Sequence, residues 1–592
     1  MSGGYEQVLV LWQLDTGKLN FLPHLSGAIE NIVVSPQGSS YAIHLDDNST
    51  MVISTEEMKP TAYISGIQSL VFSETPAKEA LVRRVWKPAD EISEPLVAAV
   101  NPLNSSQICL CVGNGQQATV GGDGPSTPHL QVFDTLSCRG LTKYAIARTS
   151  PTDANVTSQG MPIIEPTVTN IAFSKDGKWL ASVDKWQPPR ADVEAIATGA
   201  KTMDQALRER REIYLKFWEV GADGDSLQLA TRVNGAHHTD QPETIFDLVS
   251  DPSSPRFATL GDDGAVRFWA PKLRSRDGLA DTGSDGQQLK VWACSQTVLL
   301  PVSGQQDLSV ATASPKHSRS GALSFSEDGS ILFAAFGELS EAIIFAIDTE
   351  TGMVRDTISG MSKGAVRSIK SLGSSIILLS EDLVVYDIVS DELLYSFSLK
   401  DTSEAAKHLT QLAVNHASRS FAVAAPIPKP EKRVLTKYSH SELLVFSIDD
   451  SEPRFAQTLP YLITSVFPSV SSSGFIFVDA AAQLWSVTEG ADQAPLLRPL
   501  AELGVNEDTE ANTGPLSVGL EQEDDGASDE DMQDGDQDVD MDVDDDYDIH
   551  PAVVAPQRLA EIFNTAPAFA MPPIEDIFNQ VASLFSSKPV ET

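Results

Sequence analysis

The sequence has few cysteines for its length. Only four, at positions 109, 111, 138 and 294, occur in 592 residues. Four thiols cannot build a disulfide framework for a chain of this size, which indicates a reducing compartment. Cys109 and Cys111 share one face of a predicted strand, but a zinc site lacks a second close pair of cysteine or histidine ligands.

Positive charge is also scarce. The chain has 42 Lys and Arg against 82 Asp and Glu, a net charge of −40, and 16 of the acidic residues lie between Glu521 and Asp548, where no basic residue occurs. Without this run the net charge is still about −24. Such a chain repels phosphate backbones on average, so proteins are the expected partners and RNA contact requires local basic loops.

Long apolar runs and catalytic motifs are missing. No run approaches the ~20 apolar residues of a membrane span, and residues 1–7 lack the basic segment and cleavage site of a secretory signal. The sequence contains no Gly-rich phosphate loop, no Gly-x-Ser-x-Gly elbow and no cluster of metal ligands. We therefore expect a soluble intracellular protein that is not an enzyme, has no cofactor or small-molecule substrate, and does not bind a membrane.

One stretch, residues 237–270, contains a complete repeat unit. Three short apolar runs, at 244–250, 256–260 and 265–269, are separated by Asp-Pro-Ser-Ser-Pro and Gly-Asp-Asp-Gly, which are typical of hairpin turns. A fourth strand is expected at 288–293. The stretch resembles a WD repeat, with a histidine near its start, an Asp-Gly turn and a tryptophan closing the third strand, although Ala270 stands where the motif usually has Asp.

The WD resemblance implies a buried polar chain that satisfies its own donors and acceptors. Its members would be Asp263, His237 or His238, Thr259 and Trp269. The alternative, a histidine pair acting as metal ligand or catalytic base, lacks carboxylate or cysteine partners at ligand spacing. We therefore interpret these residues as structural.

The repeat recurs through the chain and predicts an all-β fold. First strands near residues 95, 167, 244, 321, 365, 409 and 462 predict a seven-bladed WD-repeat β-propeller over residues 94–495. Two of the spacings are 44 residues, within the WD period of ~40 to 45. The last blade lacks a clear fourth strand, and a segment at 67–72 is expected to supply it and close the ring.

The first 72 residues read as the last blades of an incomplete N-terminal propeller, joined by a connector at 73–93. Residues 8–14 and 18–25 predict a third and an outer strand, and 28–66 predict one whole blade. Because so small a piece would leave sheet edges and core open, we expect a shortened form, an incomplete gene model or blades supplied from elsewhere.

An insert at 187–212 predicts a short helix that begins with a capping box at Thr202. Arg208, Arg210 and Arg211 form a basic group on it. One interpretation is a solvated helix face balanced by Glu209 and Glu212; the other is contact with RNA or an acidic partner.

The C-terminal region divides into two parts. Residues 502–548 have little apolar content and dense negative charge, which predicts a disordered linker. Residues 549–592 predict two short amphipathic helices around a Pro-rich elbow, which either pack on the propeller or dock into a partner's groove. The residues expected to dock are Leu559, Ile562, Phe563, Ile577, Phe578, Leu584 and Phe585.

Several stretches together resemble one family. They are Val-Leu-Val-Leu-Trp-Gln-Leu at 8–14, Phe-Leu-Pro-His-Leu at 21–25, Ile-Val-Val-Ser-Pro at 32–36, the strand pair around Asn170 and Lys178, and the C-terminal Ile-Phe-Asn-Thr and Met-Pro-Pro segments. On these the chain resembles the WD-repeat NET-associated nuclear proteins, t-UTP (UTP-A) subunits of the U3 snoRNP or small-subunit processome, with most of the family's first propeller absent.

This resemblance implies a nucleolar scaffold in ribosome biogenesis. It would support pre-rRNA transcription by RNA polymerase I and U3 snoRNA-dependent processing of small-subunit rRNA. Its implied partners are other t-UTP subunits and processome proteins, with U3 snoRNA or pre-rRNA touched through local basic loops. The rival hypotheses are a WD-repeat adaptor of a ubiquitin ligase or chromatin complex, and an enzyme using the central channel.

Overall fold

The computed structural model describes the chain between residues 2 and 499, apart from gaps at 69–91, 114–126, 150–163, 194–202, 302–318 and 428–434 and shorter breaks of up to four residues. Strands dominate it, with the short helices α2 (Met203–Glu209) and α3 (Glu404–His408). Almost all of the predicted connector 73–93, the acidic linker 502–548 and the C-terminal helices 549–592 lie outside the described residues.

Between residues 98 and 499 the described strands form seven four-stranded antiparallel sheets, which we number 1 to 7 in chain order. Sheets 1 to 3 contain β7 (Ala98–Val100), β8 (Gln107–Val112), β9 (His129–Asp134) and β10 (Arg139–Ala145); β11 (Thr167–Phe173), β12 (Trp179–Trp186), β13 (Glu212–Val220) and β14 (Leu227–Asn234); and β15 (Ile245–Ser250), β16 (Phe257–Gly261), β17 (Ala265–Leu273) and β20 (Lys290–Leu299).

Sheets 4 and 5 contain β21 (Arg319–Phe325), β22 (Ile331–Glu338), β23 (Ala342–Asp348) and β24 (Val354–Ile358); and β25 (Ser368–Leu372), β26 (Ser375–Leu379), β27 (Asp382–Asp387) and β28 (Glu392–Ser398). Sheets 6 and 7 contain β29 (Gln411–Asn415), β30 (Ser420–Ile427), β31 (His440–Ser447) and β32 (Phe455–Leu459); and β33 (Ile463–Pro468), β34 (Phe475–Asp479), β35 (Leu484–Gly490) and β36 (Gln493–Pro499).

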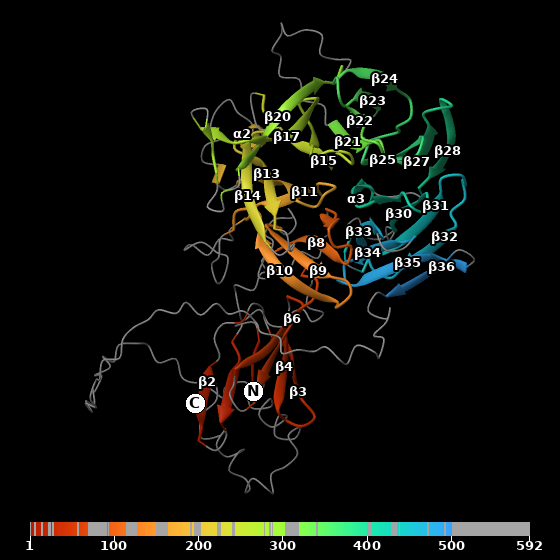
Figure 1. Ribbon diagram of the computed structural model, residues 1–592. Coiled ribbons are helices and arrows are strands. Elements are labelled where there is room, and N and C mark those ends of the chain that lie inside the picture. The colour runs from red at the N-terminus through yellow and green to blue at the C-terminus, as the bar shows by residue number, and fades with distance from the viewer. Residues whose placement is uncertain are drawn as a thin grey trace. The chain divides into compact units, whose positions relative to one another are not determined.

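The seven sheets close into a ring (Figure 1). The first strands of consecutive sheets lie side by side in the order β7, β11, β15, β21, β25, β29, β33, and β33 again neighbours β7. At the closure the backbone N–H of Leu96 donates to the carbonyl of Thr464 over 3.0 Å. Apolar side chains of sheets 1 and 7, including Leu110 and Phe467, pack together there. The predicted all-β, seven-bladed propeller is confirmed.

One detail of the predicted closure is wrong. Sheet 7 has its own fourth strand, β36, which pairs antiparallel with β35, so the segment after Ile67 is not needed as a strand. The two prolines of β36 hid it, because proline is unusual in strands but is tolerated on an edge. Ile67 instead adds its buried side chain to the apolar cluster between sheets 1 and 7.

The N-terminal residues form strands that do not belong to the seven sheets of the ring, as predicted. They are β1 (Val10–Gln13) paired with β2 (Lys18–Phe21), and one four-stranded sheet of β3 (Ile29–Val34), β4 (Ser40–Leu45), β5 (Ser49–Ser54) and β6 (Pro60–Ser65). Their core is small, with Leu9, Leu25 and Ile43 among its buried side chains. The chain after β6 is bound to sheet 1 by Gln131, whose amide donates to the Gly66 carbonyl over 2.7 Å.

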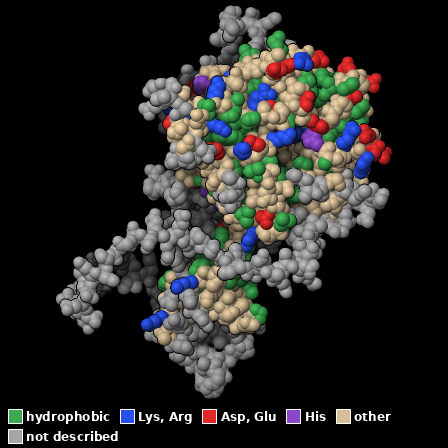
Figure 2. Space-filling view, in the orientation of Figure 1, with side chains coloured by type: hydrophobic (Ala, Val, Ile, Leu, Met, Phe, Trp, Pro, Cys, Tyr) green, Lys and Arg blue, Asp and Glu red, His purple; other side chains and the backbone are tan. Residues whose placement is uncertain are grey.

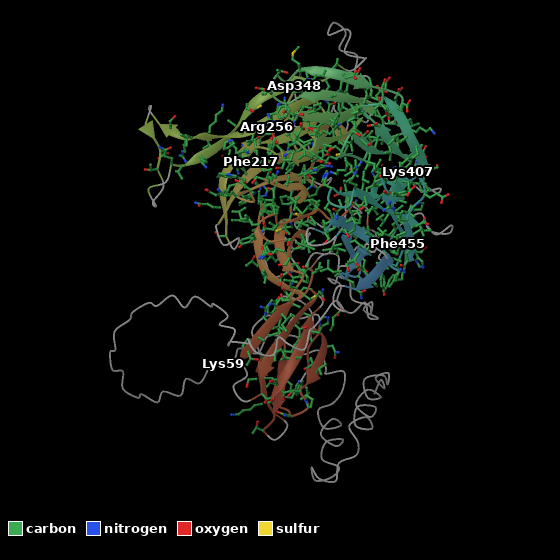
Figure 3. The ribbon with its side chains drawn as sticks, turned by 45° about the vertical axis from the view of Figure 1, so that its right-hand side comes forward. Lys59, Phe217, Arg256, Asp348, Lys407 and Phe455 are labelled. Carbon is green, nitrogen blue, oxygen red and sulfur yellow. The ribbon has the colours of Figure 1, made fainter. Side chains whose placement is uncertain are left out.

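Apolar clusters fill the space between neighbouring sheets of the ring. The cluster between sheets 2 and 3 is rich in aromatic rings: Trp292 stacks on Phe217 with 4.6 Å between ring centroids and meets Trp179 edge-on at 5.4 Å. Phe217 is labelled in Figure 3. Trp292 lies on β20, which runs from 290 to 299 instead of the predicted 288–293. The connection between β17 and β20 contains a separate two-stranded sheet of β18 (Ser275–Arg276) and β19 (Leu279–Ala280).

The surface of the ring carries both signs of charge. On the face shown in Figure 2, acidic side chains gather where Figure 1 labels β24 and β28, whereas Lys and Arg are spread among apolar side chains over the rest of that face. The predicted helix in the 187–212 insert is present as α2. It holds its place through buried Ala206 and Leu207, which pack on Val193.

Candidate functional site

A chain of hydrogen-bonded side chains crosses sheet 3. His237 lies in the loop between β14 and β15, and its Nδ1 is 2.8 Å from Asp263 Oδ1 in the turn between β16 and β17. Its Nε2 is 2.8 Å from the hydroxyl of Thr259 on β16, and the indole Nε1 of Trp269 on β17 donates to the same hydroxyl over 2.9 Å. The structure therefore brings together Asp263, His237, Thr259 and Trp269.

Glycines on both sides of Asp263 allow this approach. A Cβ on Gly261 would lie 2.2 Å from His237 Nδ1, so only glycine leaves room for the imidazole. Gly264 has φ of +70°, the left-handed region that a tight hairpin turn requires. The Gly-Asp-Asp-Gly turn thus positions the carboxylate against the histidine.

Electrostatics fix the protonation of this chain. Burial would raise the pKa of Asp263, but hydrogen bonds and charge from His237 and Arg267 lower it to about 2, so the group is a carboxylate. Burial lowers the pKa of His237 more than Asp263 raises it, which favours a neutral ring. With Nδ1–H assigned as the donor to Asp263, Nε2 accepts from Thr259 and Thr259 accepts from Trp269, so each member of this chain has a partner.

The order Thr259–His237–Asp263 is also that of a hydroxyl nucleophile, its base and the carboxylate that orients the base. Access decides between the two roles. Thr259 is 0% exposed and its oxygen already accepts from Trp269, so no substrate carbonyl can reach it. The arrangement can hold sheet 3 together, and it cannot perform nucleophilic catalysis.

The structure separates the two adjacent histidines. His237 is buried in the polar chain, whereas His238 is exposed and outside it. Sequence reasoning missed Arg267 of β17, whose Nη1 is 2.6 Å from Asp263 Oδ2 and shields the carboxylate from one side. The available signal was cross-strand pairing, since Arg267 stands opposite Thr259 in the β16–β17 register.

The three arginines of the α2 region have different surroundings. Arg208 and Arg210 are exposed. Arg211 is half-buried, and its Nη1 donates to Thr244 Oγ1 over 3.0 Å. Burial also lowers the pKa of Arg211. Among the described residues of this insert, the exposed arginines are therefore Arg208 and Arg210, and Arg211 ties the insert to the start of sheet 3.

The cysteines of β8 are core residues. Cys109 and Cys111 are both buried, and burial raises the pKa of the Cys109 thiol to about 12 and that of Cys111 as well. Neither is a thiolate at neutral pH. In the part of the chain that the structure describes, no group of three or more His, Cys, Asp or Glu side chains is arranged to hold a metal ion.

Across the described ranges, no helix combines the length and apolar character needed to cross a membrane.

Comparison with known proteins gives several WD-repeat relatives. The chain is 24% identical over 487 residues to U3 small nucleolar RNA-associated protein 17 of Schizosaccharomyces pombe, an alignment that covers 81% of this chain and 52% of the relative. It is 26% identical over 342 residues to WD repeat-containing protein 75 of Xenopus laevis, covering 57% of this chain and 31% of the relative. It is 22% identical over 372 residues to NET1-associated nuclear protein 1 of Saccharomyces cerevisiae, covering 58% and 36%.

No protein-family model matches the chain. The chain spans about half the length of the first of these relatives and about a third of the other two. The resemblance that the sequence indicated is confirmed by the relatives themselves, which carry WD repeats or association with U3 small nucleolar RNA or NET1 in their names. The chain is thus similar over most of its length to a U3 small nucleolar RNA-associated protein, a WD repeat-containing protein and a NET1-associated nuclear protein.

Proposed function

We propose that the protein is a non-enzymatic scaffold subunit in ribosome biogenesis. In this role it supports pre-rRNA transcription by RNA polymerase I and U3 snoRNA-dependent processing of small-subunit rRNA in the nucleolus. The observation that carries the proposal is the similarity over 81% of the chain to a U3 small nucleolar RNA-associated protein. Its partners are other t-UTP (UTP-A) subunits and processome proteins, with RNA touched through local basic surfaces.

The ring supports a scaffolding role. Seven sheets in a closed ring hold the ends of many loops in fixed positions on its two faces. A rigid support of this kind positions contact residues better than a flexible chain does. Among the described residues, the arrangement around His237 has the order of a catalytic triad, and it is sealed from substrate. Function then depends on surfaces and not on a reaction centre.

We also propose that different segments of the chain have different roles. Residues 1–72 contribute the last blades of an N-terminal propeller, 94–495 form the main ring, and 502–548 tether the helices of 549–592. A solvated, self-repelling tether keeps such helices at high effective concentration near the ring while letting them reach a separate surface.

The test is purification of the tagged full-length chain with identification of the proteins and RNA that accompany it. We expect processome subunits, U3 snoRNA and the 5′ part of pre-rRNA, with the tagged protein in the nucleolus. Depletion should lower pre-rRNA pulse labelling and leave small-subunit precursors uncleaved. Recovery of ubiquitin-ligase subunits or histones in place of pre-ribosomal material would support the alternative adaptor role.

A further inference from the structure

Two arginines from different sheets lie over aromatic rings beside the α2 insert. Arg148 follows β10 of sheet 1, and its guanidinium carbon is 4.8 Å from the ring centroid of Trp186, the last residue of β12. Arg232 of β14 has its guanidinium carbon 5.1 Å from the ring of Tyr214 on β13. Stacking of this kind holds a guanidinium plane in place and leaves its N–H edge available.

Strand register places these groups on one face of sheet 2. Trp186 stands opposite Glu212, two residues from Tyr214 on the same strand face. Two residues after Tyr214 on β13, Lys216 lies on the same face and stands opposite Arg232 of β14. Arg148 reaches the same face from sheet 1, since its Nη1 is 3.4 Å from Glu212. The cluster therefore lies where sheets 1 and 2 meet.

The carboxylates of this cluster are already engaged. Asp184 is buried and pairs with Lys216 Nζ at 2.7 Å. Glu212 accepts a hydrogen bond from the Tyr214 hydroxyl besides its contact with Arg148. Arg232 is exposed and has no ion pair among the residues that the structure describes. Three cations against two carboxylates leave a net positive surface in a chain whose net charge is −40.

Two exposed arginines of the insert lie close to this cluster along the chain. Arg210 and Arg208 precede Glu212 by two and four residues, so their Cα atoms lie within about 7 and 14 Å of its Cα. Arg208 and Arg210 are both exposed. We call the four arginines, Arg148, Arg208, Arg210 and Arg232, together with Trp186 and Tyr214, the arginine surface.

We propose that the arginine surface binds single-stranded RNA through its phosphates and bases. Arginine forks match phosphate oxygens, and guanidinium planes and aromatic rings are the groups on which unpaired bases stack. A protein that is acidic elsewhere directs a polyanion to its local cations, because the rest of the surface repels it. The aromatic rings favour RNA over an acidic polypeptide, which would need the charges alone. This inference rests on the proposed function, since it names how a pre-rRNA scaffold touches RNA.

The experiment measures binding of a short fluorescein-labelled oligouridine to the full-length protein by anisotropy across a salt titration. The test variant is Arg148→Gln with Arg232→Gln. Its matched control is Lys363→Gln with Arg454→Gln, two exposed cations of other parts of the ring whose loss changes the net charge equally. A second variant, Arg148→Lys with Arg232→Lys, keeps the charge but loses the planar fork.

Two lost phosphate contacts should weaken binding at 0.1 M salt by about 1.4 log units, roughly 25-fold, and reduce the slope of log K against log salt by about 1.4. The lysine variant should keep the slope of the unaltered protein but bind more weakly, and the control pair should bind as the unaltered protein does. Unchanged melting temperatures exclude unfolding as the cause.

Three results overturn the inference: no binding by the unaltered protein, an equal loss in the control pair, or stronger competition by a polyglutamate peptide than by oligouridine. The last would identify an acidic polypeptide as the occupant. Purification with pre-ribosomal particles separates the two proposals. Particle association without oligouridine binding refutes the RNA surface alone, whereas oligouridine binding without particle association refutes the proposed function alone.

Discussion

Replacing Asp263 with alanine should lower the stability of the ring and leave its binding intact. The carboxylate accepts from His237, from Arg267 and, over 3.2 Å, from the backbone N–H of Ala265. Alanine removes all three hydrogen bonds at once. The imidazole of His237 has no exposed surface through which water could replace the lost partner.

The size of the effect follows from this burial. An unsatisfied buried donor costs about 1 to 3 kcal/mol, and Arg267 adds little because part of its side chain reaches solvent. If the ring of about 400 residues unfolds cooperatively, an entropy near 2.1 cal/mol/K per residue converts this to a melting temperature about 1 to 4 °C lower.

The assay is thermal unfolding followed by circular dichroism, with sedimentation of the same variant in cell extracts. Asp328→Ala is the matched control, because Asp328 lies in another Asp-Gly turn but is exposed to solvent. The control should change the melting temperature less than Asp263→Ala does. An unaltered melting temperature together with loss from the pre-ribosomal fraction would refute the structural interpretation and make Asp263 a contact residue.

Three further predictions follow from burial and sequence. Trp292→Ala should destabilise the ring by about 3 to 5 kcal/mol, measured as a lower denaturant midpoint, because it empties the aromatic cluster between sheets 2 and 3; a loss below about 1 kcal/mol would contradict this. Because burial holds the pKa of His237 below 6.5, the unfolded chain takes up a proton that the ring does not. Stability should therefore be full above pH 6.5 and fall below it, and His237→Gln should flatten that part of the curve of melting temperature against pH. Replacing Ile562 and Phe563 together by alanine should remove about 2 to 5 kcal/mol of docking and release the protein from pre-ribosomal particles while the ring melts normally; early melting with continued assembly would assign these residues to the protein's own core.

Sequence patterns correctly predicted those features that depend on residues close together in the chain. The first three strands of sheet 3 and the members of its polar chain lie within residues 237–273, so hairpin turns and strand alternation were enough to find them. The same applies to α2, whose apolar spacing is contiguous with the capping residue that the sequence predicts just before it. The choice between His237 and His238 was not decidable, because adjacent loop residues point in different directions and a loop has no period that fixes which one turns inward.

Sequence patterns did not predict those features that depend on contacts between residues far apart in the chain. β36 contains two prolines and is a strand only because β35 offers it an outer edge position. Arg148 and Arg232 are separated by more than one blade's length in sequence, and both act on the carboxylate of Asp184 because sheets 1 and 2 are neighbours in the ring. Neither arginine belongs to a basic run, so only the arrangement of sheets adds these two to Arg208 and Arg210, which the sequence already indicated.

The polar chain around His237 and the arginine surface differ in their surroundings, so experiments can separate their roles. The chain around His237 is closed: each donor has an acceptor, the members are buried, and removal of one leaves another unsatisfied, so its loss must appear as instability. The arginine surface is open: Arg148 and Arg232 lie over aromatic rings, and all four arginines are exposed, so water can replace a partner of theirs that is removed. Loss of an arginine there costs the fold little, so an effect on RNA binding cannot be ascribed to unfolding. Sheet 3 packs against a neighbouring sheet on each side, so a change in its polar chain affects the stability of the closed ring. The melting temperature therefore reports on the polar chain, whereas only a binding measurement reports on the arginine surface.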